Sequence, residues 1–307
     1  MRRWLSLLAA AALLLAGCGT NSGERTRVSL RQVAPLPTAG AQEEQRPPVL
    51  RLAVASMVSP GGAIEDYTQL AQYLEGPFGG RVELLQRRTY AETYELLRTG
   101  CADSAAVCTY VYVLGHKEFG LQLVAAPEVG GETTYRSLII VRADSGIKEF
   151  TGLKGKRFAF TDPLSTTGRL YPLLLLRERQ ETPESYFASS SYTYSHDNSI
   201  LAVLDGVADG ASVDSLVYHQ WTAAHPDKAG DLKVLQTSPP YGSPPFVVAP
   251  SAPPTLRATL RAALLSMEED KDGERVLKLL GVDLFREPAD AEYDDVRRLA
   301  ESVGMTP

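Results

Sequence analysis

The first part of the chain alternates between apolar runs and helical patterns. "VLRLAVAS" at 49–56 is typical of a buried strand, and "RVELLQR" at 81–87 alternates with period two. The segment between them places apolar residues at helical spacing and ends in a glycine pair. "TYAETYELLRTG" at 89–100 opens with Thr89 and Glu92 in capping-box spacing and ends at a glycine. This pattern predicts strands joined by helices.

The same alternation continues and then starts again. Strands are predicted at "ADSAAVCTY", "LQLVAAPEV" and "YRSLIIVRA", with a short helix at "YVYVLGHKEFG". A second series begins with the strand in "FTGLKGKRFAFTD" and a helix over Leu164–Arg179. Strands separated by helices imply right-handed βαβ units and mostly parallel sheets.

Two such series predict a two-lobed α/β fold, with helices on each sheet and a cleft between the lobes. We expect the chain to cross between the lobes near 141–145 and near 236–241. These crossings assign residues 49–142 and 241–307 to lobe 1, and 143–240 to lobe 2. Ligands of open α/β sheets bind outside the carboxyl ends of strands, so the cleft is the expected site.

The amino terminus carries an export signal. Met1-Arg2-Arg3 is basic, and the apolar run Trp4–Ala16 is shorter than the ~20 residues of a membrane span. "LAGC" resembles the bacterial lipobox, which implies removal of residues 1–17 and lipid attachment to Cys18; the alternative is an ordinary signal peptide with a chance cysteine. The polar segment 18–48 is predicted to be a flexible tether. The folded body is therefore expected outside the cytoplasm, anchored at the cell envelope.

Charge and motifs exclude several classes of function. Without the two signal arginines, 29 basic residues face 37 acidic ones, and no basic stripe suggests nucleic-acid binding. The chain has no nucleophile elbow, no Gly-x-x-x-x-Gly-Lys loop and no His-Glu-x-x-His, so we expect no enzyme. Its four histidines suggest no metal site, and no cofactor is predicted.

Cys101 and Cys108 bound the segment "CADSAAVC", read as a short strand. Seven extended steps put the two Cα atoms ~23 Å apart, whereas a disulfide needs them within ~7 Å. Both thiols are therefore predicted to be free, unless the segment folds as a loop.

The stretch "TDPLSTTG" at 161–168 precedes a long apolar helix and is the main candidate for chemistry. A helix that begins near Ser165 has unpaired N–H groups and a partial positive charge at its start. The hydroxyls of Ser165, Thr166 and Thr167 add donors, so an oxyanion is a natural ligand. The alternative is ordinary N-capping by one of these hydroxyls.

Polar side chains also stand at predicted strand exits in both lobes. Tyr90 follows one strand, and Tyr135 begins another. His196 and Asp214 each lie where a strand gives way to a helix. Each of the four has an ordinary structural interpretation on its own, but their shared position at the cleft suggests a common site.

Residues 49–250 resemble the phosphate/phosphite/phosphonate-binding family of ABC-transporter substrate-binding lipoproteins, which have the type II periplasmic-binding-protein fold. The resemblance rests on "TYAETYELLRTG", on "TTYRSLIIVRADSGIKEFTGLKGKRFAFTDPLSTTG", on "SHDNSILAVLDGVADG" and on "VDSL". It implies capture of a small phosphate-like oxyanion by hinge closure, and delivery to a permease and ATPase. It implies a monomer, with the membrane contacted through the lipid on Cys18.

The resemblance also implies roles for individual residues. The family holds the three-oxygen head of its ligand with hydroxyls at the helix start. Carried over to this chain, the ligand-binding residues are Tyr90, Tyr135, Ser165, Thr166, Thr167, His196 and Asp214.

The chain departs from the family in two places. "GSPP" at 242–245 lacks an acid that binders of amino-bearing phosphonates carry, which favours a smaller oxyanion. "VCTYVY" replaces a Gly-Pro-x-Ser-Tyr segment and brings Cys108 towards the cleft. Arsenite capture by that thiol is one interpretation, and a buried structural thiol is the other. A sensory lipoprotein that presents the ligand to a membrane histidine kinase is the alternative to transport.

Overall fold

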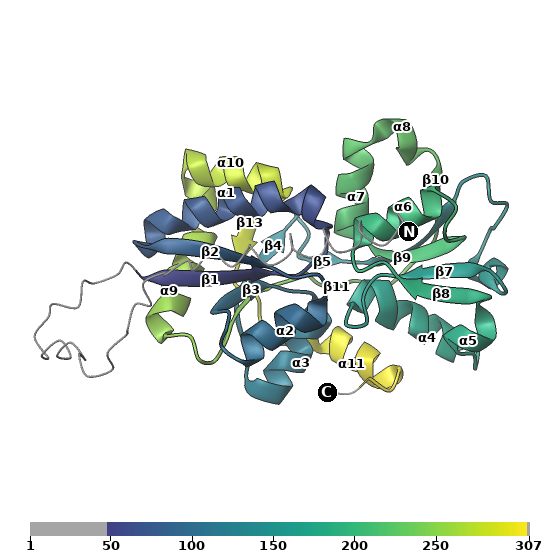
Figure 1. The fold of residues 1–307 in the computed structure, drawn as a ribbon, viewed down its shortest axis with the longest axis horizontal. Helices are drawn as coiled ribbons and strands as arrows, with labels where there is room; N and C mark the ends of the chain where they lie inside the picture. Colours follow the sequence, from purple (N-terminus) through teal and green to yellow (C-terminus); the bar gives the residue numbers. More distant parts are fainter. Residues whose placement is uncertain (1–47, 306–307) are drawn as a thin grey trace, which may run out of the picture. The chain divides into compact units, whose positions relative to one another are not determined.

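The computed structural model describes residues 48–305, apart from the side chains of residues 60–63. The predicted signal peptide and nearly all of the tether therefore lie outside the described residues. Two sheets organise the described chain (Figure 1). The six-stranded sheet has the order β13-β4-β12-β3-β1-β2, and the five-stranded sheet has the order β10-β6-β9-β7-β8. This is the expected two-lobed α/β architecture.

The strands of the six-stranded sheet are β1 (Val49–Val54), β2 (Arg81–Gln86), β3 (Ser104–Ala106), β4 (Gln122–Glu128), β12 (Phe246–Val248) and β13 (Leu284–Arg286). Those of the five-stranded sheet are β6 (Ser137–Arg142), β7 (Arg157–Phe160), β8 (Ser189–Tyr192), β9 (Gly210–Asp214) and β10 (Leu232–Thr237). Each sheet is parallel at one end, where β1 pairs parallel with β2 and β3, and β7 pairs parallel with β8 and β9. The antiparallel pairs are β12 with β3 and β4, and β13 with β4, in the six-stranded sheet, and β6 with β9 and β10 in the five-stranded sheet.

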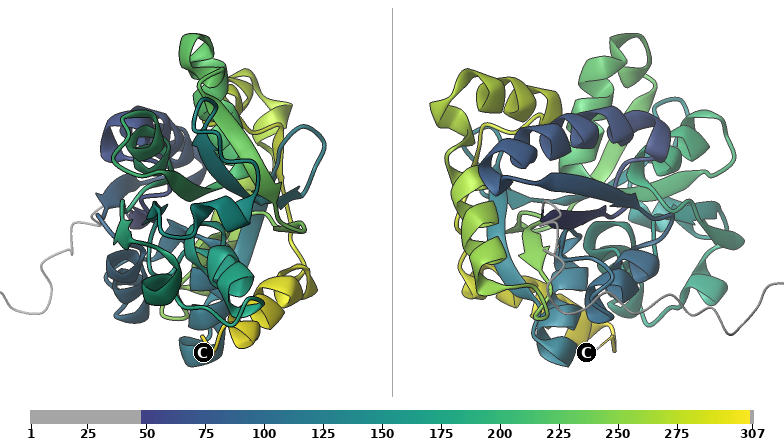
Figure 2. Two further views of the ribbon diagram at one scale, coloured as in Figure 1. Left: turned by 90° about the vertical axis from the view of Figure 1, so that its right-hand side faces the viewer. Right: turned by 60° about the vertical axis from the view of Figure 1, so that its left-hand side comes forward.

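Helices cover both faces of each sheet (Figures 1 and 2). Around the six-stranded sheet lie α1 (Pro60–Phe78), α2 (Tyr90–Arg98), α3 (Thr109–Phe119), α9 (Pro254–Leu265) and α10 (Lys271–Leu280). Around the five-stranded sheet lie α4 (Tyr171–Arg177), α5 (Pro183–Tyr186), α6 (His196–Leu204), α7 (Ser215–Ala224) and α8 (Pro226–Ala229). The last helix, α11 (Asp294–Ser302), packs against both α3 and α4.

The chain passes between the sheets through a small ribbon. Its strands are β5 (Thr134–Tyr135) and β11 (Tyr241–Gly242), which pair antiparallel with Tyr135 opposite Tyr241. The first crossing therefore precedes β6, and the predicted boundary after residue 142 assigned β6 to the wrong sheet. The apolar run 137–142 looked like a continuation of lobe 1, but it pairs with β9 and β10.

The predicted strand over 102–110 is wrong beyond Ala106. Only Ser104–Ala106 is paired, and Cys108 already has the N-cap position of α3. The extended-chain argument about the cysteines thus used the wrong geometry, although both thiols are free, with Cys101 exposed and Cys108 buried. The helix predicted over Leu164–Arg179 begins later, as a π-helical turn at Thr166–Leu170 that continues into α4.

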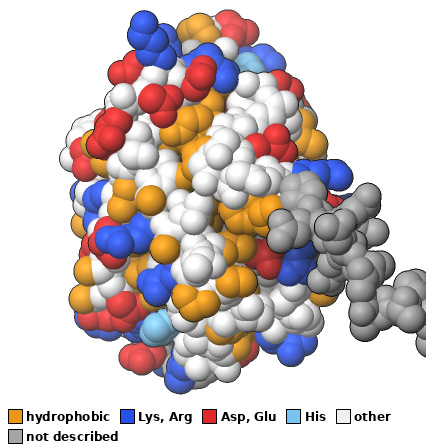
Figure 3. Space-filling view, turned by 90° about the vertical axis from the view of Figure 1, so that its left-hand side faces the viewer, with side chains coloured by type: hydrophobic (Ala, Val, Ile, Leu, Met, Phe, Trp, Pro, Cys, Tyr) orange, Lys and Arg blue, Asp and Glu red, His pale blue; other side chains and the backbone are white. Residues whose placement is uncertain are grey.

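Separate apolar cores hold the two sheets. Leu52 and Leu70 are fully buried between β1 and α1, and Ile140 and Val213 are fully buried in the five-stranded sheet. None of the helices in residues 48–305 has the length and hydrophobicity needed to cross a bilayer. On the face in Figure 3, acidic and basic side chains are interspersed rather than gathered into areas of one sign.

Candidate functional site

Buried hydroxyl groups from both sheets meet at the start of the helix that follows β7. The Thr166 hydroxyl lies 2.7 Å from the Thr109 hydroxyl, which lies 2.7 Å from the hydroxyl of Tyr135. The backbone N–H of Tyr110 donates to the same Thr166 oxygen at 3.0 Å. We call Tyr90, Thr109, Tyr135, Thr166 and Thr167 the hydroxyl cluster; all five are at most 2% exposed.

The π-helical turn exists because strand serines and a glycine shape it. Ser137 on β6 and Ser212 on β9 both donate to the Thr167 carbonyl, at 2.7 and 2.6 Å. A Cβ on Gly168 would stand 2.3 Å from the Cβ of Thr161, so only glycine lets the turn lie this close to the end of β7. π-Helical turns are often found at functional sites. The "STTG" motif thus places the Thr166 side chain against Thr109 and buries the adjacent Thr167 side chain.

Two members of the hydroxyl cluster have no hydrogen-bond partner among the described residues. They are the Tyr90 hydroxyl and the Thr167 hydroxyl, and both are buried. Burial raises the pKa of Tyr90 well above its usual value, and the nearby groups of Cys108 and Asp162 add to the rise. Buried polar groups in native proteins nearly always have partners, so these two hydroxyls are available to hydrogen-bond a ligand or an ordered water.

His196 and Asp214 form a second buried unit beside the hydroxyl cluster. The Asp214 backbone N–H donates to His196 Nδ1 at 3.1 Å, so Nε2 carries the proton of the neutral ring. Burial lowers the pKa of His196 to about 3. Burial also raises the pKa of the Asp214 carboxyl to about 7, even though its Oδ1 accepts the Leu216 and Val217 N–H groups. Near neutral pH, His196 is an uncharged donor and Asp214 is poised to titrate.

Further hydrogen bonds join the two lobes around this site. Asp162, which follows β7, accepts the Tyr90 N–H at the start of α2, at 3.1 Å. Asp197 on α6 accepts the Ser59 N–H at 2.9 Å and also accepts the Ser59 hydroxyl. The thiol of Cys108 accepts the Thr166 N–H at 3.4 Å. These hydrogen bonds therefore connect elements of the two sheets beside the hydroxyl cluster.

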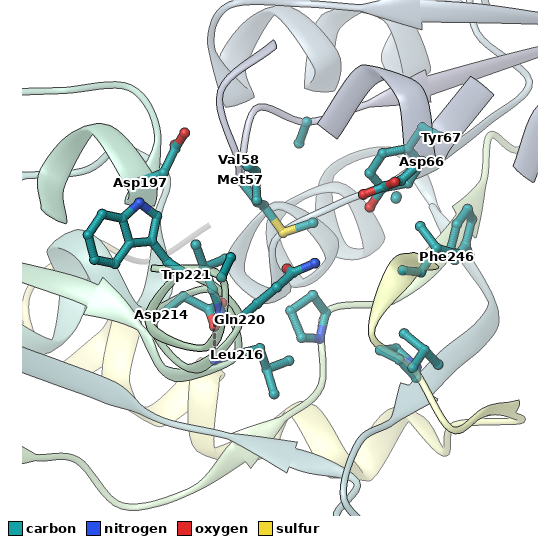
Figure 4. Close-up of a pocket in the computed structure, with 18 of the residues that line it drawn as sticks. Met57, Val58, Asp66, Tyr67, Asp197, Asp214, Leu216, Gln220, Trp221 and Phe246 are labelled. Atoms are coloured by element: carbon teal, nitrogen blue, oxygen red, sulfur yellow. Dashed lines mark hydrogen bonds between the residues drawn. The ribbon is translucent and has the colours of Figure 1, made fainter. Parts of the chain in front are cut away.

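A cavity of about 450 Å³ lies beside Asp214, between α7 and the strand ends of the six-stranded sheet. Figure 4 shows Met57 in its middle, with Trp221 and Asp197 on one side and Tyr67 and Phe246 on the other. Its lining is mostly apolar. Asp214 also contributes to this lining, next to the hydroxyl cluster.

The structure links Tyr135 with Thr166 through Thr109, and it buries Tyr90, Thr167, His196 and Asp214. A ligand site shared by these residues stays a prediction. Ser165 differs, because its hydroxyl accepts the Gly168 N–H at 2.9 Å and so makes the ordinary N-cap. Sequence reasoning missed Thr109, the hydroxyl that joins Tyr135 to Thr166. The segment "VCTYVY" was the available signal, but Thr109 was read as part of the strand that precedes the helix.

The fold and this site define a class of protein, the two-lobed periplasmic binding proteins. Residues 52–293 match the family described as ABC transporter, phosphonate, periplasmic substrate-binding protein. This match spans most of the chain, and the chain belongs to that family.

Curated relatives agree with this placement. The chain is 28% identical over 288 residues to the phosphate-import protein PhnD of Mycolicibacterium smegmatis, covering 84% of this chain and 87% of the relative. It is 26% identical over 274 residues to the phosphonates-binding periplasmic protein of Escherichia coli, covering 86% and 79%.

Solved structures share the fold. The binding protein component of an ABC phosphonate transporter from Pseudomonas aeruginosa has a TM-score of 0.79 at 22% identity, covering 84% of this chain and 87% of that one. PhnD1 from Prochlorococcus marinus in complex with methylphosphonate has a TM-score of 0.76 at 17% identity, covering 84% and 98%.

Proposed function

We propose that this chain is the lipid-anchored solute-binding protein of an ABC uptake system, and that it captures phosphate, phosphite or a small phosphonate between its lobes. The observation that carries the proposal is the pair of orphan hydroxyls, Tyr90 and Thr167, inside the hydroxyl cluster. A tetrahedral oxyanion supplies several acceptor oxygens at one point and satisfies both. The relatives that import phosphate or bind phosphonates support this ligand class.

Neutral donors hold the anion in this proposal. Among the described residues, no Lys or Arg makes a hydrogen bond to the hydroxyl cluster. A hydrogen bond to a charged group contributes ~1.5–3 kcal/mol net, so a few such bonds suffice for tight binding. The proposed ligand donors are the side chains of Tyr90, Tyr135, Thr166, Thr167 and His196, together with Ser165, whose hydroxyl accepts the Gly168 N–H but still has its own proton to donate.

Asp214 holds a proton for the anion. With a pKa of about 7, its carboxyl is either protonated beside a doubly charged ligand or ionised beside a ligand that keeps one O–H. Both arrangements contain one proton between carboxyl and ligand, and they avoid direct repulsion of two full charges. Affinity falls once rising pH removes that shared proton.

Closure around the ligand uses the β5–β11 ribbon as its hinge. We propose two lobes, one around each sheet, which meet at this ribbon. The hydrogen bonds of Ser59 with Asp197 and of Tyr90 with Asp162 then stabilise the closed state that the permease recognises. The protein acts as a monomer with a permease and an ATPase as partners. The relative that is named as a phosphate-import protein gives no support to the sensory alternative.

Cys18 anchors the protein at the outer side of a membrane. This proposal rests on the lipobox alone, and labelled fatty acid supplied to producing cells tests it. The wild-type protein should carry the label and sediment with membranes. Cys18→Ala should be unlabelled and soluble, and a labelled Cys18→Ala protein would refute the anchor.

Isothermal titration with phosphate, phosphite, methylphosphonate and sulfate tests the ligand class. We expect at least one phosphorus anion to bind, and Thr167→Ala to weaken that binding at least tenfold. Ser190→Ala, an exposed hydroxyl on β8, is the matched control and should leave affinity unchanged. If no phosphorus anion binds, or if both variants behave alike, the proposed function is wrong.

A further inference from the structure

The apolar cavity beside Asp214 is much larger than the oxyanion needs. At ~30 Å³ per water, about 450 Å³ corresponds to roughly fifteen waters. Phosphate and phosphite are compact anions, and the hydroxyl cluster already supplies their polar partners. The cavity adds carbon surface instead, including Met57, Leu216, Trp221 and Phe246.

Helix α7 connects this cavity with the proposed anion site. Asp214 caps the helix through Oδ1, at 2.7 Å from the Leu216 N–H. One face of α7 then lines the cavity, and its residues follow helical spacing: Leu216, Val217, Gln220, Trp221 and Ala224. The Trp221 ring stacks on the His225 ring with centroids 4.3 Å apart, and this contact holds the indole in the cavity lining. Asp214 thus lines the cavity and also belongs to the proposed anion site, so a substituent directed past it would meet apolar side chains.

Resting on the proposed function, we infer that the preferred ligand is an organophosphorus anion whose apolar substituent of several carbons fills this cavity while its PO₃ head occupies the hydroxyl cluster. Aromatic and aliphatic walls favour an uncharged alkyl or aryl group. Each methylene that is fully buried raises affinity by up to about fourfold. Three further methylenes should therefore raise affinity at least tenfold, even when burial is incomplete.

Titration calorimetry with methylphosphonate, butylphosphonate and benzylphosphonate tests the inference. We expect butylphosphonate and benzylphosphonate to bind at least tenfold more tightly than methylphosphonate. Phenylphosphonate and phenyl phosphate are compared as well, to tell a carbon-linked from an ester-linked substituent. Equal or weaker binding of the larger phosphonates would overturn the inference.

A variant that fills the cavity makes the test specific. Gln220 is exposed on α7 and reaches into the cavity, so Gln220→Trp should occupy it without disturbing the core (Figure 4). We expect benzylphosphonate to lose at least tenfold in affinity and methylphosphonate to change less than twofold. His219→Trp, on the same helix but outside the lining, is the matched control and should bind both ligands as the wild type does.

The outcomes separate this inference from the proposed function. If methylphosphonate or phosphate binds but benzylphosphonate gains nothing, only the substituent pocket is wrong. If no phosphorus anion binds, the proposed function fails first. If benzyl alcohol binds as tightly as benzylphosphonate, the cavity acts independently of the hydroxyl cluster, and the inference is overturned.

Discussion

Tyr90→Phe should make the ligand-free protein more stable and its ligand binding weaker. Tyr90 is 0% exposed, and its hydroxyl has no partner among the described residues. An unsatisfied buried hydroxyl costs ~1–3 kcal/mol, whereas phenylalanine keeps the ring and its packing. For a chain of this size, each kcal/mol changes Tm by about 2–4 °C. We therefore expect the ligand-free variant to melt several degrees higher than the wild type.

The same substitution removes a donor to the bound anion. A hydrogen bond to a charged acceptor contributes ~1.5–3 kcal/mol, so affinity should fall roughly tenfold to a hundredfold. Thermal melts without ligand, together with titration calorimetry against the phosphorus anion that binds best, measure the two effects. Both the gain in stability and the loss of affinity should appear in the Tyr90→Phe variant.

Tyr186→Phe provides the comparison. The Tyr186 hydroxyl is also buried but donates to the Phe150 carbonyl at 3.0 Å, away from the hydroxyl cluster. Its loss should lower stability by ~1 kcal/mol and leave affinity unchanged. The reasoning is refuted if ligand-free Tyr90→Phe melts below the wild type, or if it binds the anion equally well.

Three more changes test the surrounding structure. Thr166→Val removes the hydroxyl that joins Thr109 and the Tyr110 N–H, and should lower both Tm and affinity, the latter at least tenfold by calorimetry. Ser59→Ala removes the hydroxyl that donates to Asp197 but keeps the backbone N–H bond, and should raise the ligand dissociation rate in stopped flow without altering the hydroxyl cluster; an unchanged rate would remove the hydroxyl bond from the closure mechanism. Asp214→Asn should abolish the loss of affinity above pH 7, and a wild-type pH profile in this variant would exclude the shared proton.

The pH dependence of stability gives a further measurement on the buried pair. His196, with its pKa lowered to about 3, is neutral when folded, so it makes stability rise with pH between about 3 and 6.5. Asp214, with its pKa raised to about 7, makes stability fall between about 4 and 7. The two slopes oppose each other over pH 4–6.5. In Asp214→Asn only the histidine effect remains, so the free energy of unfolding should rise by about 3 kcal/mol between pH 4 and 6.5. Urea unfolding measures this rise, and a free energy that does not change with pH would contradict the prediction.

Regular patterns in the sequence predicted most of the architecture. The capping box of Thr89 and Glu92 is present, and it places Tyr90 at the first position of α2. Period-two and helical spacing are local properties, so strands and helices of ordinary length can be read from them. The ribbon of β5 and β11 has two residues in each strand, too few for any pattern, and the first crossing was consequently misplaced.

The site was predictable only in part, for a similar reason. Thr166 and Thr167 stand in a recognisable helix start, but Thr109 acquires its role only when the lobes approach each other. Pairing across 57 positions in the chain leaves no local signal. The apolar face of α7 looks like any core-facing helix in sequence. Its opening onto a cavity depends on how the two sheets are placed.

The central claim is that the hydroxyl cluster binds a tetrahedral phosphorus anion, and a crystal structure with methylphosphonate tests it most directly. The account predicts that ligand oxygens lie ~2.5–3.2 Å from both the Tyr90 hydroxyl and the Thr167 hydroxyl. An anion bound elsewhere, with these two hydroxyls still without partners, would contradict it.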